Sequence, residues 1–159
     1  MPTTMDDIRD FLAQRRIAMI GVSRNAKDFS RLLFAELVKR GYDMVPVNPT
    51  IDHIDSRQCF PSVQAVHPAP DAALLMTASS ITAEVVRDCA AAGVRRIWMY
   101  SAGRQGAVNQ EAVAFCRDNG LQLIEGHCPY MFLPGAAVFH RVHGLVLKIT
   151  GRYPKRVAA

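Results

Sequence analysis

The sequence predicts a single-domain α/β fold in which a doubly wound parallel sheet of about five strands carries helices on both faces. Three observations lead to this fold class. Short apolar runs alternate with helical segments along the chain. The runs IAMIG, AALLM and RIWMY are continuously apolar, as strands buried on both faces are. A glycine that can end a helix in the left-handed conformation follows each internal helical segment, at Gly41, Gly93 and Gly120.

The predicted elements follow one another in the order that such a sheet requires. The first is an amphipathic helix near residues 5–14, with Thr4 as its N-cap because a threonine side chain can accept a hydrogen bond from the first turn. Further helices are predicted near 29–40, 80–92 and 109–119, between the apolar runs. The runs predicted as strands are Arg16–Ile20, Tyr42–Val47, Ala72–Met76, Arg96–Tyr100 and Leu121–Ile124.

One domain accounts for the whole chain, because 159 residues match the usual size of a single hydrophobic core. It comprises an N-terminal helix (1–14), the sheet with its helices (15–133) and a C-terminal segment of the same domain (134–159). Residues 50–70 contain three prolines and no long apolar period, which predicts a crossover with at most one short strand and one short helix. An extra C-terminal helix with a basic tail is predicted from apolar residues at helical spacing: Val138, Val142, Leu145 and Ile149.

Composition and charge exclude several classes of protein. The longest apolar runs are far shorter than the roughly 20 residues that cross a bilayer, so no membrane helix is expected. The N-terminus lacks the basic start and apolar core of a secretory signal, which favours a cytoplasmic protein. The net charge of +5 is dispersed, which favours an anionic small molecule over nucleic acid. Four cysteines without a CxxC pair predict free thiols and no metal site, with Cys89 and Cys116 in the core.

Function is expected in the loops that follow the strands, because ligands of open α/β sheets bind beyond the carboxyl ends of the strands. These loops are 21–28, 48–50, 77–80, 101–108 and 125–134. They include GVSRNAKDFS, NPT, TASS, SAGRQGAV and EGHCPYMF. We expect all of them to share one edge of the sheet.

The first of these loops has the features of a phosphate cradle. Gly21 allows a tight turn after the first strand, and Ser23 and the amides near Asp28–Ser30 can face an anion at the positive end of the next helix. Arg24 and Lys27 add positive charge. A Gly21→Val change is therefore expected to block a phosphate and to leave the fold largely intact, because the turn lies at the rim.

Two absences narrow the choice of nucleotide. The dinucleotide fingerprint GxGxxG is incomplete, since Ser23 and Ala26 stand at its third and sixth positions. The second strand ends in VPVNP, so Asn48 and Pro49 replace the acidic residue that binds the ribose hydroxyls of NAD. NAD is therefore disfavoured. The motif GxxxxGK[ST] does not occur either, so a P-loop kinase or ATPase is not supported.

Four segments, taken in order, carry a resemblance to a known family. They are IAMIGVSRNAKDFSRLLFAELVKRGYDMVPVNPT, FPSVQAVHPAPDAALLMT, AAAGVRRIWMYSAG and CRDNGLQLIEGHCP, and they cover roughly residues 12–133. They resemble the CoA-binding domain family, whose Rossmann-like domain is similar to the N-terminal domain of the succinyl-CoA synthetase alpha subunit. The resemblance implies a protein that holds coenzyme A or acyl-CoA, with the nucleotide end at the first glycine loop.

Site residues follow from the resemblance by position. The family's G-x-S/T turn falls on Gly21–Ser23, its VNP on Val47–Pro49, its loop after the third strand on Thr77–Ser80, and its CP on Cys128–Pro129. The lack of an acid after the second strand suits CoA, because a carboxylate would repel the phosphate on its ribose. The predicted ligand-binding residues are Gly21, Val22, Ser23, Arg24, Lys27, Ser30, Asn48, Pro49, Thr77, Ala78, Ser101 and Cys128.

We expect no catalysis by the chain itself. His127 and Cys128 are adjacent on the predicted rim, but neighbours in an extended loop usually point apart, and no complete set of nucleophile, base and oxyanion donor is evident. His140 and His143 are interpreted as surface or interface residues and not as metal ligands. The prediction is a CoA-binding sensor, carrier or regulatory module.

Two alternative functions are left open. One is an enzyme that acts on CoA thioesters through His127 and Cys128, and the other is an NAD(P)(H)-binding redox-responsive module. A homodimer or an unknown protein partner is also left open. Neither nucleic acid nor a membrane is expected as a partner.

Overall fold

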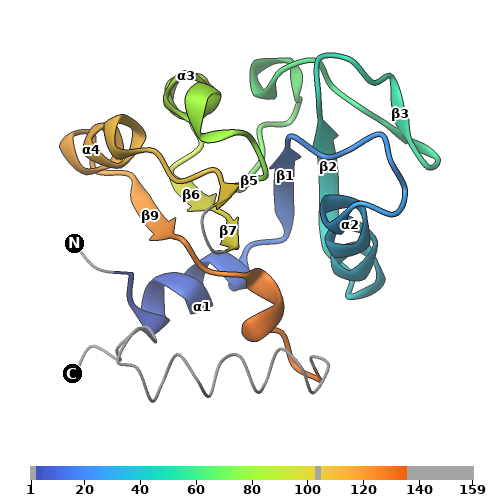
Figure 1. Cartoon of the computed structure of the whole chain (residues 1–159), viewed down its shortest axis with the longest axis horizontal. Coiled ribbons are helices and arrows are strands. Elements are labelled where there is room, and N and C mark those ends of the chain that lie inside the picture. The colour runs from blue at the N-terminus through green and yellow to red at the C-terminus, as the bar shows by residue number, and fades with distance from the viewer. Residues whose placement is uncertain (1–2, 103–104, 136–159) are drawn as a thin grey trace.

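A five-stranded parallel sheet forms the centre of the chain, with the strand order β2-β1-β5-β6-β9 (Figure 1). The structure is a computed structural model that describes residues 3–102 and 105–135. The strands of this sheet are β1 (Arg16–Ile20), β2 (Asp43–Val47), β5 (Ala72–Leu75), β6 (Arg96–Met99) and β9 (Gln122–Glu125). The doubly wound α/β fold predicted from the sequence is confirmed, with each strand within one or two residues of its predicted ends.

A short bridge extends the sheet beyond β2. Val47 and Phe60 pair in parallel: the amide of Phe60 donates to the carbonyl of Pro46, and the amide of Asn48 donates to the carbonyl of Phe60, each at 2.9 Å. If the segment at Phe60 is counted as a strand, the order across the sheet is Phe60, β2, β1, β5, β6, β9. Numbered by their position along the chain, these are the third, second, first, fourth, fifth and sixth strands, which is the Rossmann order. The order reverses between β1 and β5, and ligands of such folds bind at the carboxyl ends of the strands at this point.

Helices cover both faces of the sheet (Figure 1). The α-helices among the described residues are α1 (Met5–Ala13), α2 (Phe29–Lys39), α3 (Ser79–Ala91) and α4 (Gln110–Asp118). Successive side chains of a strand point to opposite faces, so Ile17 and Met19 of β1 join the core beneath α1 and α2. Ala18 and Ile20 join the core beneath α3 and α4. Both faces are therefore apolar along one strand, as the continuous apolar runs indicated.

The N-terminal helix α1 belongs to the same core as the sheet. Thr4 caps it as predicted: its hydroxyl accepts from the amide of Asp7 at 3.1 Å, and the Asp7 carboxylate accepts from the amide of Thr4 at 2.9 Å. Phe11 is buried and meets the ring of Trp98 edge-on, with the ring centroids 5.1 Å apart. The aromatic contact attaches α1 to β6.

The crossover after β2 contains more structure than the sequence predicted. Two-residue strands β3 (His53–Ile54) and β4 (Arg57–Gln58) form an antiparallel hairpin, with Asp55 at a positive φ of 53° between them. The expectation of at most one short strand is therefore wrong, because a two-residue strand is too short to show any periodicity. The short helix is present as the 3₁₀ turn η1 (Val63–Ala65).

Several local predictions are confirmed. Gly41, Gly93 and Gly120 follow α2, α3 and α4 with φ values of 91°, 83° and 64°. Cys89 and Cys116 are buried in the core beneath α3 and α4, and all four cysteines are free. These features depend on contacts close in sequence or on a simple apolar face, which is why the sequence reveals them.

The remaining elements lie at the carboxyl edge of the sheet. A small hairpin consists of β7 (Ser101–Ala102) and β8 (Gln105–Gly106), and a second 3₁₀ turn, η2, spans Pro129–Met131.

The predicted C-terminal helix, with His140 and His143, lies outside the described residues, which end at residue 135. Within the described ranges, no helix is both long and apolar enough to span a membrane, and no three His, Cys, Asp or Glu side chains form a potential metal site.

Phe11→Ala should lower the free energy of unfolding by about 3–5 kcal/mol, because it leaves a cavity beside Trp98. Trp98 is the single tryptophan, so its fluorescence follows unfolding in urea. Leu32→Ala is the control, since the Leu32 side chain is 54% exposed and its loss should change stability by less than about 0.5 kcal/mol. If Phe11→Ala lowers the free energy of unfolding no more than the control does, the packing of α1 against Trp98 of β6 is contradicted.

Candidate functional site

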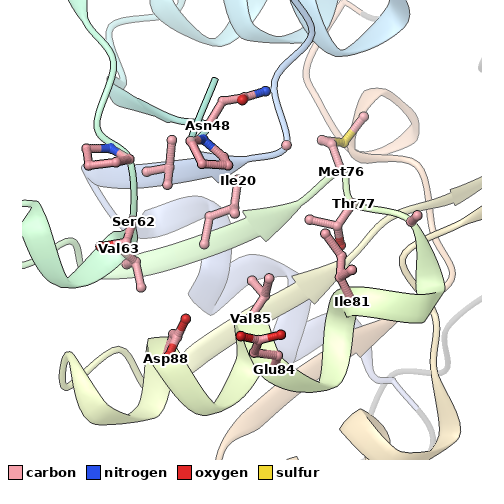
Figure 2. A pocket seen from close by; sticks show the side chains of 15 residues that line it. Ile20, Asn48, Ser62, Val63, Met76, Thr77, Ile81, Glu84, Val85 and Asp88 are labelled. Carbon is pink, nitrogen blue, oxygen red and sulfur yellow. The ribbon is translucent and has the colours of Figure 1, made fainter. Parts of the chain in front are cut away.

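A cavity of about 490 Å³ lies at the carboxyl ends of β1, β2 and β5 (Figure 2). This is the point where the strand order reverses, and therefore where the fold predicts a ligand. Ile20 and Val47 end two of the strands in its wall, and Met76 follows the third. Asn48 and Pro49 line the side nearest β2, and the rest of the lining comes from Gly21, from the residues before and within η1, and from the residues before and within α3.

Gly21 makes the sharp turn that leads from β1 to the rim. Its φ is 89°, a value that glycine adopts readily and other residues rarely do. Its amide donates to the carbonyl of Val47 at 2.9 Å. An added Cβ would lie 3.0 Å from the carbonyl carbon and the oxygen of Met76. The expectation that Gly21→Val leaves the fold largely intact is therefore wrong, because the backbone after β5 occupies the space that a side chain needs.

The loop from Ser23 to Ser30 is held by its own hydrogen bonds. Asp28 is the N-cap of α2, and its carboxylate accepts from the amide of Ser30 at 2.9 Å and from its hydroxyl at 2.7 Å. The Ser30 hydroxyl accepts from the amide of Ser23 at 2.9 Å. The expectation that the amides near Asp28–Ser30 face an anion is thus corrected: a carboxylate of the chain already stands at this helix end. Ser30 shapes the loop, and its contact with a ligand stays a prediction.

The start of α3 is a better place for an anion. Its N-cap is Ala78, and none of the described side chains caps it. Alanine is among the poorest N-cap residues. The amide of Ile81 donates to the carbonyl of Ala78 at 3.2 Å, but the amides of Ser79 and Ser80 have no partner among the described residues, beside the cavity that Ala78 lines. Thr77 lies just before it and is buried, with its hydroxyl 3.0 Å from that of Thr82. The signal in the sequence was TASS, where alanine stands at the position that a capping residue usually takes.

Asn48 connects the loop after β1 with the loop after β2. Its Nδ2 donates to the carbonyl of Val22 at 2.9 Å, and its Oδ1 accepts from the amide and the hydroxyl of Thr50, both at 2.9 Å. Arg24 reaches the same loop, since its Nη2 donates to the carbonyl of Thr50 at 2.6 Å. The guanidinium of Arg24 therefore lies beside the loop that follows β2. Lys27 is exposed and forms no ion pair in the described part of the chain.

Cys128 lies away from the cavity, at the start of η2. It neighbours Tyr100 and Tyr130, which pack with Phe29 against the core beneath α1 and α2. The Phe29 ring stacks on Tyr100 with centroids 5.2 Å apart and lies 5.8 Å from the ring of Tyr130.

The predicted ligand-binding residues fall into three places. Five line the cavity: Gly21, Asn48, Pro49, Thr77 and Ala78. Five belong to the adjacent loop: Val22, Ser23, Arg24, Lys27 and Ser30. The other two, Ser101 and Cys128, are outside the cavity lining.

The surroundings of Cys128 favour a neutral thiol. Burial raises the pKa of this thiol above its usual value, and the amides of η2 offset only part of the shift. Burial also lowers the pKa of His127, whose ring meets the edge of Phe132 with centroids 6.1 Å apart. The carbonyl of His127 accepts from the indole of Trp98 at 2.9 Å. Both shifts act against the thiolate–imidazolium pair that a cysteine nucleophile uses.

The sequence reasoning missed one wall of the cavity. Ile81, Glu84, Val85 and Asp88 line it from α3, and Val63 of η1 and the preceding Ser62 line it from the other side (Figure 2). The signal available was the spacing i, i+3, i+4 and i+7 along the helix, which places the first four on one face. That face looks like an ordinary amphipathic surface until the strand order is known.

Comparison with known proteins identifies the family. A family model described as CoA binding domain matches residues 15–134. The chain belongs to the CoA-binding domain family. The resemblance predicted from the sequence is thus confirmed, and the Rossmann-like strand order agrees with it.

Relatives of this CoA-binding domain include both long and short proteins. It is 29% identical over 102 residues to Acetate--CoA ligase [ADP-forming] II of Archaeoglobus fulgidus, which covers 63% of this chain but only 15% of the ligase. It is 25% identical over 123 residues to a Bacillus subtilis protein named Uncharacterized protein YneT, with 77% of this chain and 88% of that protein covered. The chain therefore spans a small part of the ligase and most of the short relative.

Solved structures share the fold. A hypothetical protein from Pyrococcus horikoshii OT3 superposes with a TM-score of 0.74 and 26% identity, over 81% of this chain and 91% of that one. The apo form of the dinucleotide forming Acetyl-coenzyme A synthetase 1 of Ca. Korarchaeum cryptofilum gives a TM-score of 0.63 and 23% identity, over 74% of this chain and 27% of the synthetase. The second likeness is one of fold alone.

Gly21→Ala should lower the free energy of unfolding by about 2–4 kcal/mol, because the added Cβ brings both backbone strain and contact with Met76. Gly41→Ala is the matched control: its φ is 91°, but nothing lies within 4 Å of an added Cβ, so only the strain of about 1–2 kcal/mol is expected. Urea unfolding measures both variants. Equal losses would contradict the close approach of Gly21 to the backbone after β5.

Cys128 should react slowly with iodoacetamide at pH 7 and faster as the pH rises beyond 9.0, the ordinary pKa of a cysteine, because its raised pKa preserves the unreactive thiol. Mass spectrometry after timed alkylation gives the rate at each cysteine. Cys89 is the internal control: it is fully buried and burial raises its pKa further, so it should react more slowly still. Rapid reaction of Cys128 at pH 7 would contradict the neutral thiol and favour an enzyme.

Proposed function

We propose that the chain binds coenzyme A or acyl-CoA at the carboxyl edge of its sheet and serves as a sensor, carrier or regulatory module without chemistry of its own. The observation that carries the proposal is the cavity at the reversal of strand order, in a chain of the CoA-binding domain family. A volume of about 490 Å³ is in the range of small-molecule sites.

The base of the nucleotide is assigned to the cavity. Aliphatic side chains form much of its walls: Val63 from η1 and Ile81 and Val85 from α3 (Figure 2), together with Val47 at the end of β2. A flat ring between such walls removes apolar surface from water on both of its faces. Among the described residues no lysine or arginine lines the cavity, so phosphates have no cationic partner from that part of the chain there.

The phosphate on the ribose is assigned to Arg24. In dinucleotide-binding domains an acid at the end of the second strand binds the ribose hydroxyls, and a nearby arginine accommodates a phosphate there. In this chain Asn48 takes the place of the acid, and Arg24 lies beside the same loop through its bond to Thr50. Lys27 supplies a second charge nearby. This arrangement supports CoA, which carries such a phosphate, over NAD.

The pyrophosphate is assigned to the space between the turn at Gly21–Ser23 and the start of α3. The uncapped amides after Ala78 and the positive end of the helix dipole favour an anion there. From this point the pantetheine arm would pass the carboxyl ends of β5 and β6, by Ser101, toward Cys128. The neutral thiol and the tyrosines beside it suit contact with an uncharged thiol or thioester.

A binding role is supported over catalysis by the shifts at Cys128 and His127, which disfavour an ion pair. The ligase relative acts on acetate and CoA by its name, but this chain spans 15% of its length. Its reaction therefore does not carry over. An enzyme acting on CoA thioesters and an NAD(P)(H)-binding module are the alternatives that the next experiment separates.

Calorimetric titration of the ligand-free protein with CoA, 3′-dephospho-CoA, acetyl-CoA, NAD and NADP tests the proposal. We expect CoA and acetyl-CoA to bind with similar affinity. CoA should bind at least about tenfold more tightly than 3′-dephospho-CoA, because a hydrogen bond between charged groups contributes about 1.5–3 kcal/mol. Arg24→Gln should remove most of this preference.

Arg95→Gln is the matched control, since Arg95 is an exposed cation just before β6, at the opposite edge of the sheet. It should keep the preference for CoA. Binding of NAD or NADP without CoA would overturn the proposal in favour of a redox-responsive module. Turnover of acetyl-CoA during the titration would overturn its non-catalytic part.

A further inference from the structure

The cavity has an acidic wall that the assignments above leave unexplained. Glu84 and Asp88 are one helical turn apart on the face of α3 that lines the cavity. Figure 2 shows the Asp88 carboxylate pointing toward Ser62 and Val63, while Glu84, an exposed residue, lines the open side of the cavity next to Val85. These groups lie farther along α3 than Ala78, so they meet whatever part of a ligand enters past the start of the helix.

The other polar side chains of the cavity are already satisfied within the protein. The hydroxyl of Thr77 pairs with a neighbouring threonine, and the amide of Asn48 holds the two loops together. In contrast, the carboxylates of Glu84 and Asp88 form no hydrogen bond or ion pair with the described residues. The hydroxyl of Ser62 does not cap η1 and is likewise without a partner there.

No basic group of the described chain neutralises this wall. Arg87 is close in sequence but turns to α4, where it pairs with Glu111 and lies 5.7 Å from the ring centroid of Phe115. The polar groups of this wall are therefore two carboxyl groups without a basic partner among the described residues and one hydroxyl. Such a wall repels phosphate and attracts a group with N–H donors.

We infer that Glu84 and Asp88 determine which base the cavity accepts, by accepting hydrogen bonds from the exocyclic amino group of a 6-aminopurine. This inference rests on the proposed function. The hydroxyl of Ser62 can donate to a ring nitrogen of the same base. A 6-oxopurine would instead bring a carbonyl oxygen toward two carboxylates, which costs affinity. The same wall orients the ligand, because it repels the phosphates toward the start of α3 and Arg24.

The test compares CoA with its deaminated analogue, in which hypoxanthine replaces adenine, by calorimetry. The wild-type protein should bind CoA at least about tenfold more tightly, as one lost hydrogen bond to a charged group predicts. In the double variant Glu84→Gln with Asp88→Asn the ratio should fall to about one or invert, because an amide can donate to the oxo group. Each single variant should give an intermediate ratio.

Asp118→Asn is the matched control, since Asp118 is exposed at the end of α4 and outside the cavity lining. Its ratio should equal that of the wild type. Equal binding of both ligands by the wild type, or an unchanged ratio in the double variant, would overturn the inference and leave the proposed function standing. Binding of neither ligand by the wild type would overturn the proposed function itself.

Discussion

The hydrogen bonding of β1 to both of its neighbours is the constraint on which the rest of the structure depends. Ile17–Ile20 pair with β2 on one side and with β5 on the other. At the end of β1 the amide of Met76 donates to the carbonyl of Ile20 at 2.8 Å, and the amide of Gly21 donates to Val47. The backbones approach so closely that residue 21 has no room for a side chain. Backbone geometry therefore sets the rim of the cavity, and the loops start from positions that the sheet has already determined.

Two helix starts at this rim show how polar groups divide between structure and function. In the first turn of α2 the amide of Ser30 donates to the Asp28 carboxylate, and the Ser30 hydroxyl in turn accepts from the amide of Ser23. The first turn of α3 has Ala78 at its N-cap and no capping side chain among the described residues. Unsatisfied helix amides favour an external anion, whereas satisfied ones do not. The side of the rim nearest α3 is therefore the more suitable place for a phosphate, even though the loop before α2 is richer in basic residues.

The sequence predicted the parts of the molecule that depend on local order. Apolar runs between Arg16 and Glu125 marked the strands of the central sheet, because a strand buried on both faces has to be apolar throughout. The sequence did not predict short elements such as the hairpin of β3 and β4, because a strand of two residues is too short to show an alternation of apolar and polar residues. The sequence also did not predict that Ser30 bonds within its own loop, and the reason is different. A serine near a helix start can bind an anion or bond to its own loop, and only the positions of Asp28 and Ser23 distinguish the two.

The sequence by itself determined the fold class, the order of the elements and the family, because each follows from residue types at fixed spacing along the chain. It also located the rim loops, since ligands of this fold class bind at the carboxyl ends of the strands. Only the tertiary structure decided which residues of the rim share one cavity. Glu84 and Asp88 of α3 line the cavity and Cys128 lies away from it, because the strand order brings β1, β2 and β5 together and sets β9 at the far edge. Which strands are neighbours depends on contacts between distant segments, and local spacing carries no record of those contacts.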